Sequence, residues 1–321
     1  MNTVAVISTM HEAGYKLLES RPDLLTVRRV TDVSPEGILQ GVTGVEAILV
    51  RTQLLPKDVL EKAPNLKVVA RHGIGTDNID VAYLSSRRIP VAIATDSNVT
   101  SVAEHSLMFL LALAKAFPAA DAAARAGDFG WREGRHPTDV EGKSILIMGF
   151  GRIGQRLGAY CQALGMKVLA YDPYVEKSPL AGVDMVKDFR EVLPQVDFVS
   201  LHMPFMPETR NLIGAAELKA MKPNAYLINA ARGGIVDEDA LNAALDAGEI
   251  AGAALDVFAV EPPDTSHPLF ANKKVLLTPH SAAATEGAFM RMATQAAQNI
   301  IDCLEGKLQP RVIVNRKALG M

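Results

Sequence analysis

The 321-residue sequence has few cysteines, no excess of basic charge and no long apolar run. Its two cysteines, Cys161 and Cys303, lie far apart in segments with helical spacing, so we expect reduced core thiols and not a disulfide or a metal pair. A formal net charge of −3 argues against a nucleic-acid-binding surface. The uncharged stretch 105–114 is too short to cross a bilayer. The composition is that of a globular enzyme.

Targeting and metal signals are also missing. The first eight residues, MNTVAVIS, carry no basic residue before their apolar ones and are typical of a strand, so we expect a cytoplasmic protein. The histidines show no H-E-x-x-H or paired-carboxylate spacing. We therefore expect no catalytic metal.

One segment indicates a dinucleotide site. An apolar strand beginning at Ser144 leads into the G-x-G-x-x-G turn 149–154. Gly149 allows a sharp turn, Gly151 lets a pyrophosphate approach the backbone, and Gly154 lets the next helix pack on the sheet. The N-terminus of that helix offers N–H groups to the phosphates. Asp172 follows the next predicted strand, where a carboxylate accepts ribose hydroxyls and repels a 2′-phosphate, which favours NAD over NADP.

Short apolar strands alternate with helical stretches, which predicts an α/β protein with parallel sheets. In the first part of the chain we place strands near 3–8, 26–30, 46–50, 67–70 and 90–93. From residue 144 we place strands near 144–149, 167–171, 184–186, 196–201, 225–229, 252–256 and 275–278. The predicted fold is a doubly wound Rossmann dinucleotide-binding domain plus a smaller, flavodoxin-like α/β substrate domain.

Two predicted helices set the domain boundaries. Asn98 and the segment 101–104 resemble a capping signal for a helix over about 99–117. This helix is apolar almost all round and is expected at a domain or subunit interface. The last helix, about 286–304, has an apolar face that could return to the first unit. We therefore predict a discontinuous substrate-binding domain, 1–98 and 284–321, and an NAD-binding domain, 99–283.

Reactive side chains also follow later strands, where open α/β sheets gather their ligands. Hydride transfer to a 2-keto acid needs a cation for the carboxylate and a proton donor for the alkoxide, and Arg232 and His280 supply these groups. Glu261 is available to orient the imidazole and favour its protonated form. Each residue also has an ordinary interpretation: a solvated loop charge for Arg232, a satisfied loop histidine for His280 and a cap before a Pro-Pro turn for Glu261.

In this order the motifs resemble the NAD-dependent D-isomer-specific 2-hydroxyacid dehydrogenases, and within them the phosphoglycerate dehydrogenase branch. The resemblance covers nearly the whole chain. It is carried by the segments 71–80 (RHGIGTDNID), 149–154 (GFGRIG), the Arg232 segment, 252–258 (GAALDVF) and 279–280 (PH). Family members are usually dimers joined through the nucleotide domain, so a homodimer is expected.

The resemblance also implies roles for individual residues. It makes Arg232, Glu261 and His280 the catalytic triad, with His280 as acid or base. It implies that backbone N–H groups of Gly73, Ile74 and Gly75 bind the substrate carboxylate, and that Asp256 meets the nicotinamide amide. The residues placed around the NAD cofactor are Gly149, Gly151, Arg152, Ile153, Gly154, Asp172, His202, Pro204, Thr209, Ala230 and Asp256.

Arg51 and Arg71 bear on the substrate. In the phosphoglycerate dehydrogenases the matching positions also carry arginine and face the substrate's distal anion, and a bidentate guanidinium suits phosphate or sulfonate. The alternative is that one or both pair with surface acids. His72 is either a further donor or turned to solvent. Because the sequence ends at Met321, we expect no C-terminal regulatory domain and no control by serine through one.

Several functions stay open. A 3-phosphoglycerate-like substrate is favoured, but glyoxylate or hydroxypyruvate reduction and sulfolactate oxidation use the same carboxylate and 2-hydroxyl. Formate dehydrogenases share the architecture but pair their histidine with glutamine, so Glu261 argues against that activity. A non-enzymatic alternative is an NAD-sensing corepressor that uses the fold as a binding module, and nothing in the first domain supports it over an enzyme.

Overall fold

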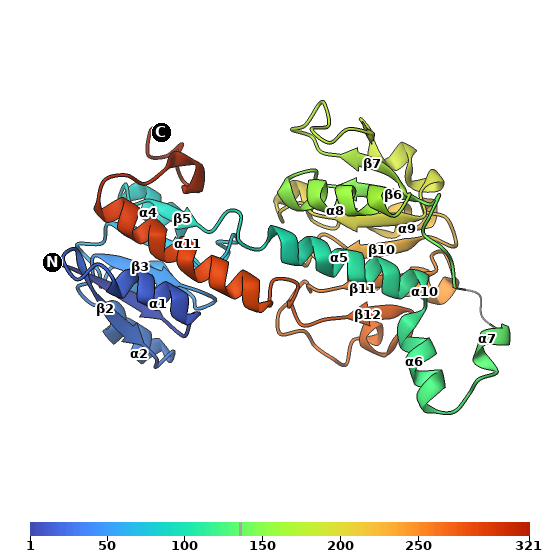
Figure 1. The fold of residues 1–321 in the computed structure, drawn as a ribbon, viewed down its shortest axis with the longest axis horizontal. Coiled ribbons are helices and arrows are strands. Elements are labelled where there is room, and N and C mark those ends of the chain that lie inside the picture. Colours follow the sequence, from blue (N-terminus) through green and yellow to red (C-terminus); the bar gives the residue numbers. More distant parts are fainter. Residues whose placement is uncertain (135–136) are drawn as a thin grey trace. The chain divides into compact units, whose positions relative to one another are not determined.

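The computed structural model describes residues 1–134 and 137–321. Within them the chain divides into two compact units (Figure 1). Unit 1 comprises Met1–Asn98 and Ala284–Met321, and unit 2 comprises Val99–Ala283. Each unit is built on its own parallel sheet.

Unit 1 contains a five-stranded sheet in the order β2-β1-β3-β4-β5, with all neighbours parallel. This is the flavodoxin-like order, so the predicted fold of this unit is confirmed. Its strands are β1 (Asn2–Ile7), β2 (Leu25–Val30), β3 (Ala47–Val50), β4 (Val68–Arg71) and β5 (Val91–Ile93). Its helices are α1 (Glu12–Glu19), α2 (Pro35–Val42), α3 (Lys57–Leu60), α4 (Val81–Ser86) and α11 (Glu286–Leu304).

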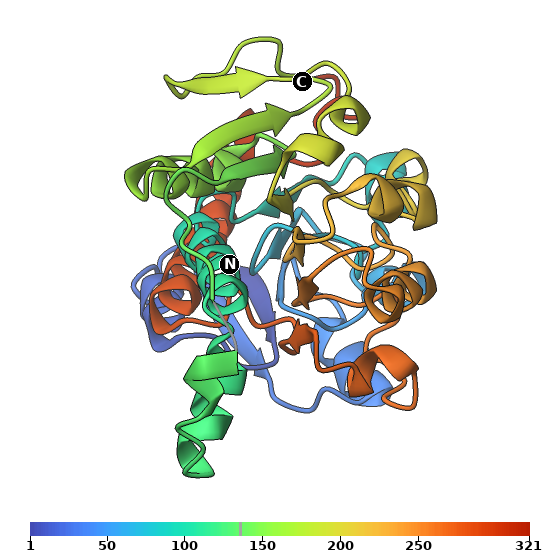
Figure 2. The ribbon, with the colours of Figure 1, turned by 90° about the vertical axis from the view of Figure 1, so that its right-hand side faces the viewer.

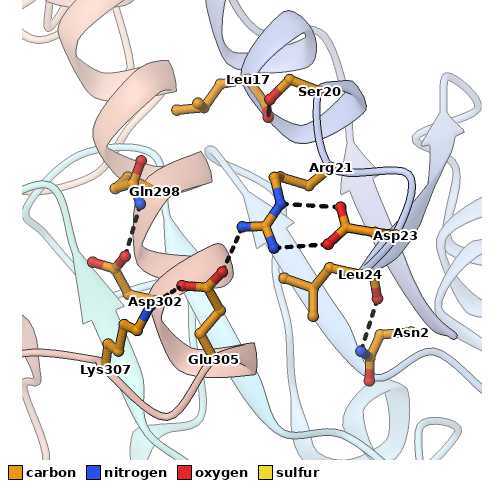
Figure 3. Close-up of polar contacts among 10 residues, drawn as sticks. All are labelled: Asn2, Leu17, Ser20, Arg21, Asp23, Leu24, Gln298, Asp302, Glu305 and Lys307. Atoms are coloured by element: carbon orange, nitrogen blue, oxygen red, sulfur yellow. Dashed lines mark hydrogen bonds and ion pairs between the residues drawn. The ribbon is translucent and has the colours of Figure 1, made fainter.

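Helix α11 packs against unit 1 although it comes from the other end of the chain. Figure 1 shows it (red) beside α1. Ala297 and Ile300 are buried in the same cluster as Val4 of strand β1. Polar contacts at its C-terminal end add to this apolar packing, because Arg21 holds Asp23 through two nitrogens and also reaches Glu305 at 2.5 Å (Figure 3). The predicted return of the last helix to the first sheet is thus observed.

Unit 2 contains a seven-stranded sheet in the order β12-β11-β10-β9-β6-β7-β8, again with all neighbours parallel. This order confirms the doubly wound Rossmann prediction, and the strand order reverses between β6 and β9. Its strands are β6 (Ser144–Met148), β7 (Lys167–Tyr171), β8 (Val183–Met185), β9 (Phe198–Leu201), β10 (Tyr226–Asn229), β11 (Gly252–Leu255) and β12 (Val275–Leu277). Its helices are α5 (Val99–Ala114), α6 (Phe117–Arg125), α7 (Trp131–Gly134), α8 (Arg152–Ala163), α9 (Ala215–Ala220) and α10 (Glu238–Ala247).

The helix predicted over about 99–117 is observed as α5, but it ends earlier than predicted. Helix α5 ends at Ala114, and α6 begins at Phe117 after a sharp bend. Ala116 adopts a left-handed φ of 48°, and Pro118 lies in the first turn of α6, where a proline disfavours continuation of the preceding helix. Figure 2 shows α6 (green) running away from the sheet of its own unit. One face of α5 is buried in unit 2, whereas Met108 on another face is 46% exposed.

Neither cysteine forms a disulfide within the described part of the chain. Cys161 is buried in α8, and Cys303 is half-buried in α11. Burial raises the pKa of Cys161 to about 12 and that of Cys303 to about 11. Both are therefore protonated thiols at neutral pH.

No single helix among the described residues is long and apolar enough to cross a membrane. Only α5 and α6 taken together, bent by 61°, satisfy that test of length and composition.

Candidate active site

The glycine turn after β6 shows a different constraint at each of its three glycines. Gly149 has a φ of 88°, and a Cβ there would lie 2.6 Å from the His202 carbonyl carbon. A Cβ on Gly154 would lie 2.3 Å from the Gly149 oxygen. At Gly151, by contrast, no described atom lies within 4 Å of an added Cβ. Gly149 and Gly154 therefore serve the chain's own packing, whereas Gly151 leaves space beside its backbone.

This open space fits the phosphates of a dinucleotide. Gly151 is the N-cap of α8 and supplies no side chain to the first N–H groups of that helix, which begins at Arg152. Orphan N–H groups and the positive end of the helix dipole suit an anion. A Cβ on Gly151 would project into the space that such an anion needs.

Asp172 follows β7 and is bonded to the glycine turn itself. Its Oδ2 accepts from the N–H of Phe150 at 2.8 Å, and its Oδ1 accepts from the N–H of Tyr174 at 2.9 Å. A carboxylate oxygen has two lone pairs, so each oxygen can accept a further hydroxyl. The carboxylate thus lies beside the turn where the sequence places the ribose.

His280 and Glu261 contact each other, although they follow different strands. Nδ1 of His280 lies 2.7 Å from Oε2 of Glu261, and the two side chains are 51% and 36% exposed. The other Glu261 oxygen accepts from the N–H of Phe258 at 3.0 Å, which fixes the carboxylate. With Nδ1 bonded to a carboxylate, Nε2 is the imidazole nitrogen left for a proton transfer.

Arg232 lies in a separate loop that follows β10. Its guanidinium donates to the carbonyl of Ala231 at 2.8 Å, and its own carbonyl accepts from the side chain of Asn229 at 2.9 Å. Close packing shapes the same loop, because a Cβ on Gly233 would lie 1.8 Å from the oxygen of Phe258. The Arg232 loop is therefore packed directly against the loop that contains Glu261.

The remaining predicted cofactor residues line the ends of β9 and β10. His202 lies 2.8 Å from Ser200 Oγ through Nε2, its Nδ1 has no partner among the described residues, and burial lowers its pKa to about 4. Thr209 closes the loop after His202 by donating to the carbonyl of Pro204 at 2.9 Å and accepting from a backbone N–H. Ala230 is buried with Val102.

Asp256 follows β11 and is only 1% exposed. Oδ1 accepts from the Thr278 hydroxyl at 2.6 Å and from the N–H of Ser281 at 2.7 Å, and Oδ2 accepts from the N–H of Ala282 at 2.9 Å. These charge-assisted bonds offset the cost of burying the carboxylate. The implied nicotinamide partner is thus also the anchor of the loop that carries His280.

In unit 1, Arg51 and His72 share a neighbour in α11. The Arg51 guanidinium lies over the ring of Phe289, 4.8 Å from its centroid, and it forms no ion pair with any described residue. The His72 ring is 2% exposed and lies 6.4 Å from the same ring. Its two nitrogens have no partner among the described residues, and burial together with the nearby Arg51 charge lowers its pKa to about 4. His72 is therefore not turned to solvent.

Arg71 wraps around the turn that follows it. Its Nε donates to the carbonyl of Gly75 at 2.8 Å, and a second nitrogen contacts the carbonyl of His72. The N–H of Gly73 donates to the Arg71 carbonyl at 2.9 Å, which leaves the N–H groups of Ile74 and Gly75 as the candidates for an anion. Arg71 thus shapes the turn, and its predicted contact with a distal anion stays a prediction.

Sequence reasoning missed Phe289. It lies more than two hundred residues from Arg51 along the chain, and no local pattern distinguishes it from the other apolar residues of α11.

The described residues contain no cluster of three or more His, Cys, Asp or Glu side chains able to hold a metal ion.

Comparisons with known proteins identify one family. The family model described as D-isomer specific 2-hydroxyacid dehydrogenase, NAD binding domain, matches residues 107–282. A D-3-phosphoglycerate dehydrogenase of Methanocaldococcus jannaschii is 38% identical over 316 residues, which are 98% of this chain and 59% of that protein. The chain thus spans little more than half the length of this relative.

Two solved structures are similar over almost their full length. A protein of Thermus thermophilus has a TM-score of 0.85 at 32% identity, with 97% of this chain and 99% of the other covered. The D-lactate dehydrogenase of Aquifex aeolicus, solved with NAD and lactic acid, has a TM-score of 0.84 at 29% identity, with the same coverage. The chain belongs to the D-isomer specific 2-hydroxyacid dehydrogenase family, which confirms the predicted family.

The glycine turn yields a matched pair of substitutions. Gly154→Ala should destabilise unit 2 by about 1–3 kcal/mol, because its Cβ meets backbone that cannot move aside. Gly151→Ala should leave stability near that of the parent but weaken NADH binding, because its Cβ enters the open space at the N-terminus of α8. Thermal unfolding and a fluorescence titration with NADH measure the two effects. Equal melting temperatures for the two variants would contradict this division of roles.

Proposed function

We propose that this chain is an NAD-dependent oxidoreductase that interconverts a D-2-hydroxy acid and its 2-keto acid. The observation that carries the proposal is the 2.7 Å contact between His280 and Glu261, in the same unit as a glycine turn that fits a dinucleotide. Family membership supports the same reaction class. A corepressor-like binding module would need the dinucleotide turn but no paired imidazole and carboxylate.

The chemistry divides among three side chains. The Arg232 cation holds the substrate carboxylate and polarises the 2-keto oxygen. His280 holds a proton at Nε2 and donates it to that oxygen during reduction, or removes it from the 2-hydroxyl during oxidation. Glu261 fixes the tautomer and orientation of the imidazole through Nδ1. When bound, the cofactor would accept a hydride as NAD during oxidation and supply one as NADH during reduction, and the turn 149–154 and Asp172 would hold it.

For the substrate, we propose an acid with a second anionic group, such as 3-phosphoglycerate. Arg51 supports this choice, because its guanidinium is held on an aromatic face and forms no ion pair with a described residue. Arg71 supports it by holding the turn that offers the N–H groups of Ile74 and Gly75. Reduction of hydroxypyruvate or glyoxylate, or oxidation of sulfolactate, is the alternative within the same reaction class.

A homodimer and a cytoplasmic location complete the proposal. The dimer is supported by the exposed side of α5, where Leu107, Met108, Leu111 and Phe117 line a largely apolar groove of about 470 Å³. Phe117 is 63% exposed and Met108 is 46% exposed, so this groove presents a contiguous apolar surface of the kind that marks an interaction site. The location rests on the sequence alone.

Substitutions at Asp172 test the cofactor assignment. Asp172→Ser should weaken NAD binding measurably, because each lost charge-assisted hydrogen bond is worth about 1.5–3 kcal/mol. Asp172→Asn keeps an acceptor oxygen toward the backbone but loses the charge, so it should narrow the preference for NAD over NADP. Calorimetric dissociation constants for both cofactors measure the change. An NAD affinity equal to that of the parent in both variants would refute the ribose contact.

Substitutions at His280 and Glu261 test the proton transfer. His280→Ala should lower kcat by about 10²–10⁴-fold without weakening NADH binding, because the acid–base group is lost and the glycine turn is untouched. Glu261→Gln removes the carboxylate that holds Nδ1, so kcat for keto-acid reduction should fall while NADH binding stays near that of the parent. Steady-state rates and a titration with NADH measure the two effects. A kcat equal to that of the parent in Glu261→Gln would remove Glu261 from the mechanism.

Arg51 tests the substrate class. Arg51→Ala should raise KM for hydroxypyruvate phosphate by about 10-fold or more, since a charge-assisted bond of about 1.5–3 kcal/mol is lost, and should affect glyoxylate much less. Arg51→Lys is the control, because it keeps the charge but not the planar fork. Arg71→Ala should lower kcat/KM for both substrates, because it releases the turn that follows Arg71. An unchanged dianion-to-monoanion ratio of kcat/KM in Arg51→Ala would favour a general hydroxypyruvate or glyoxylate reductase.

A further inference from the structure

His105 lies on α5, outside the residues that the proposed chemistry uses. Its side chain is 14% exposed, and its ring packs edge-on against Phe109 with centroids 4.5 Å apart. Nε2 lies 3.0 Å from Oγ1 of Thr278 and 3.7 Å from Oδ1 of Asp256. The imidazole therefore connects a packed helix to the loop that carries His280.

The direction of these hydrogen bonds follows from the groups involved. A carboxylate can only accept a hydrogen bond, so the Thr278 hydroxyl donates its one proton to Oδ1 of Asp256 at 2.6 Å. Oγ1 of Thr278 must then accept from His105, which places a proton on Nε2. Burial lowers the pKa of His105, although the Asp256 charge opposes the shift. The neutral Nε2–H tautomer is thus the form of His105 that completes the hydrogen-bond chain from His105 through Thr278 to Asp256 at neutral pH.

Asp256, at the far end of this hydrogen-bond chain, holds the backbone around His280. Asp256 accepts from the N–H groups of Ser281 and Ala282, and its carbonyl accepts from the N–H of His280 at 2.7 Å. His280 has a φ of 50°, in the left-handed region, which is unfavourable for a residue other than glycine. The bonds to Asp256 offset that cost, so the conformation depends on the orientation of the Asp256 carboxylate.

We propose that His105 is a positioning residue for the reaction. Its Nε2–H, acting through the Thr278 hydroxyl and the Asp256 carboxylate, holds the loop 278–282 in the conformation that places His280 against Glu261. The inference rests on the proposed function only in the role given to His280. The rival interpretation is that His105 is a core residue whose ring fills space beside Phe109.

The experiment compares two donor-removing variants with two donor-retaining ones. His105→Leu removes the donor, whereas His105→Gln keeps an N–H near the position of Nε2. Thr278→Val removes the hydroxyl, whereas Thr278→Ser keeps it. The readouts are thermal unfolding, hydrogen exchange of the peptide spanning 278–283, and kcat and KM for keto-acid reduction.

We expect His105→Leu and Thr278→Val to accelerate hydrogen exchange in the loop 278–282 and to lower kcat by up to about 100-fold. The KM for the keto acid should stay unchanged, because a misplaced imidazole leaves the substrate-binding groups in place. The Gln and Ser variants should keep parent-like exchange and kcat. The double variant His105→Leu/Thr278→Val should lose no more kcat than the worse of the two single variants, because both substitutions break the same hydrogen-bond chain.

Parent-like loop exchange in His105→Leu, or equal losses in His105→Gln and His105→Leu, would overturn the positioning role. A general loss of melting temperature with equal exchange across unit 2 would assign His105 to packing and overturn it as well. Failure of the proposed function is distinguishable: His280→Ala would then keep its activity, while the exchange of the loop would still report on His105.

Discussion

The parallel sheet of unit 2 is the constraint on which its candidate site depends. Because all seven strands run in one direction, every loop that follows a strand leaves from the same edge. The glycine turn, Asp172, Arg232, Asp256 and the loop of His280 all follow strands in this way. The reversal of strand order between β6 and β9 separates the crossovers on the two sides and leaves room at that edge for a ligand.

Three side chains with buried polar atoms directly follow strands, namely His72 after β4, His202 after β9 and Asp256 after β11. His72 and His202 each have a pKa lowered to about 4, so both are neutral at neutral pH. The Asp256 carboxylate is buried but receives a hydroxyl and two N–H groups. A buried polar group without partners is costly, and evolution retains it mainly where function needs it. Their positions therefore support a functional edge in each sheet, independently of the catalytic residues.

Local pattern was sufficient for the strands but not for every helix. Apolar runs bounded by turn residues are a local signal, and the observed strands fall within about two residues of the predicted ones. The helix predicted over about 99–117 ends early, at Ala114, because the backbone turns at Ala116 ahead of Pro118 although the apolar periodicity continues through residue 117. Proline was the available signal, and its restriction on the preceding residues outweighed the apolar pattern.

The sequence by itself determined the fold class, through the alternation of strands and helices along the chain. It also determined the glycine turn and the residue types that the chemistry needs, because these lie in short contiguous motifs. Only the tertiary structure decided which of those residues meet. It placed Glu261 on Nδ1 of His280, turned Arg71 onto its own loop, and set Phe289 beneath Arg51. Side-chain direction and contacts between distant segments depend on how the elements pack, and no local pattern records that packing.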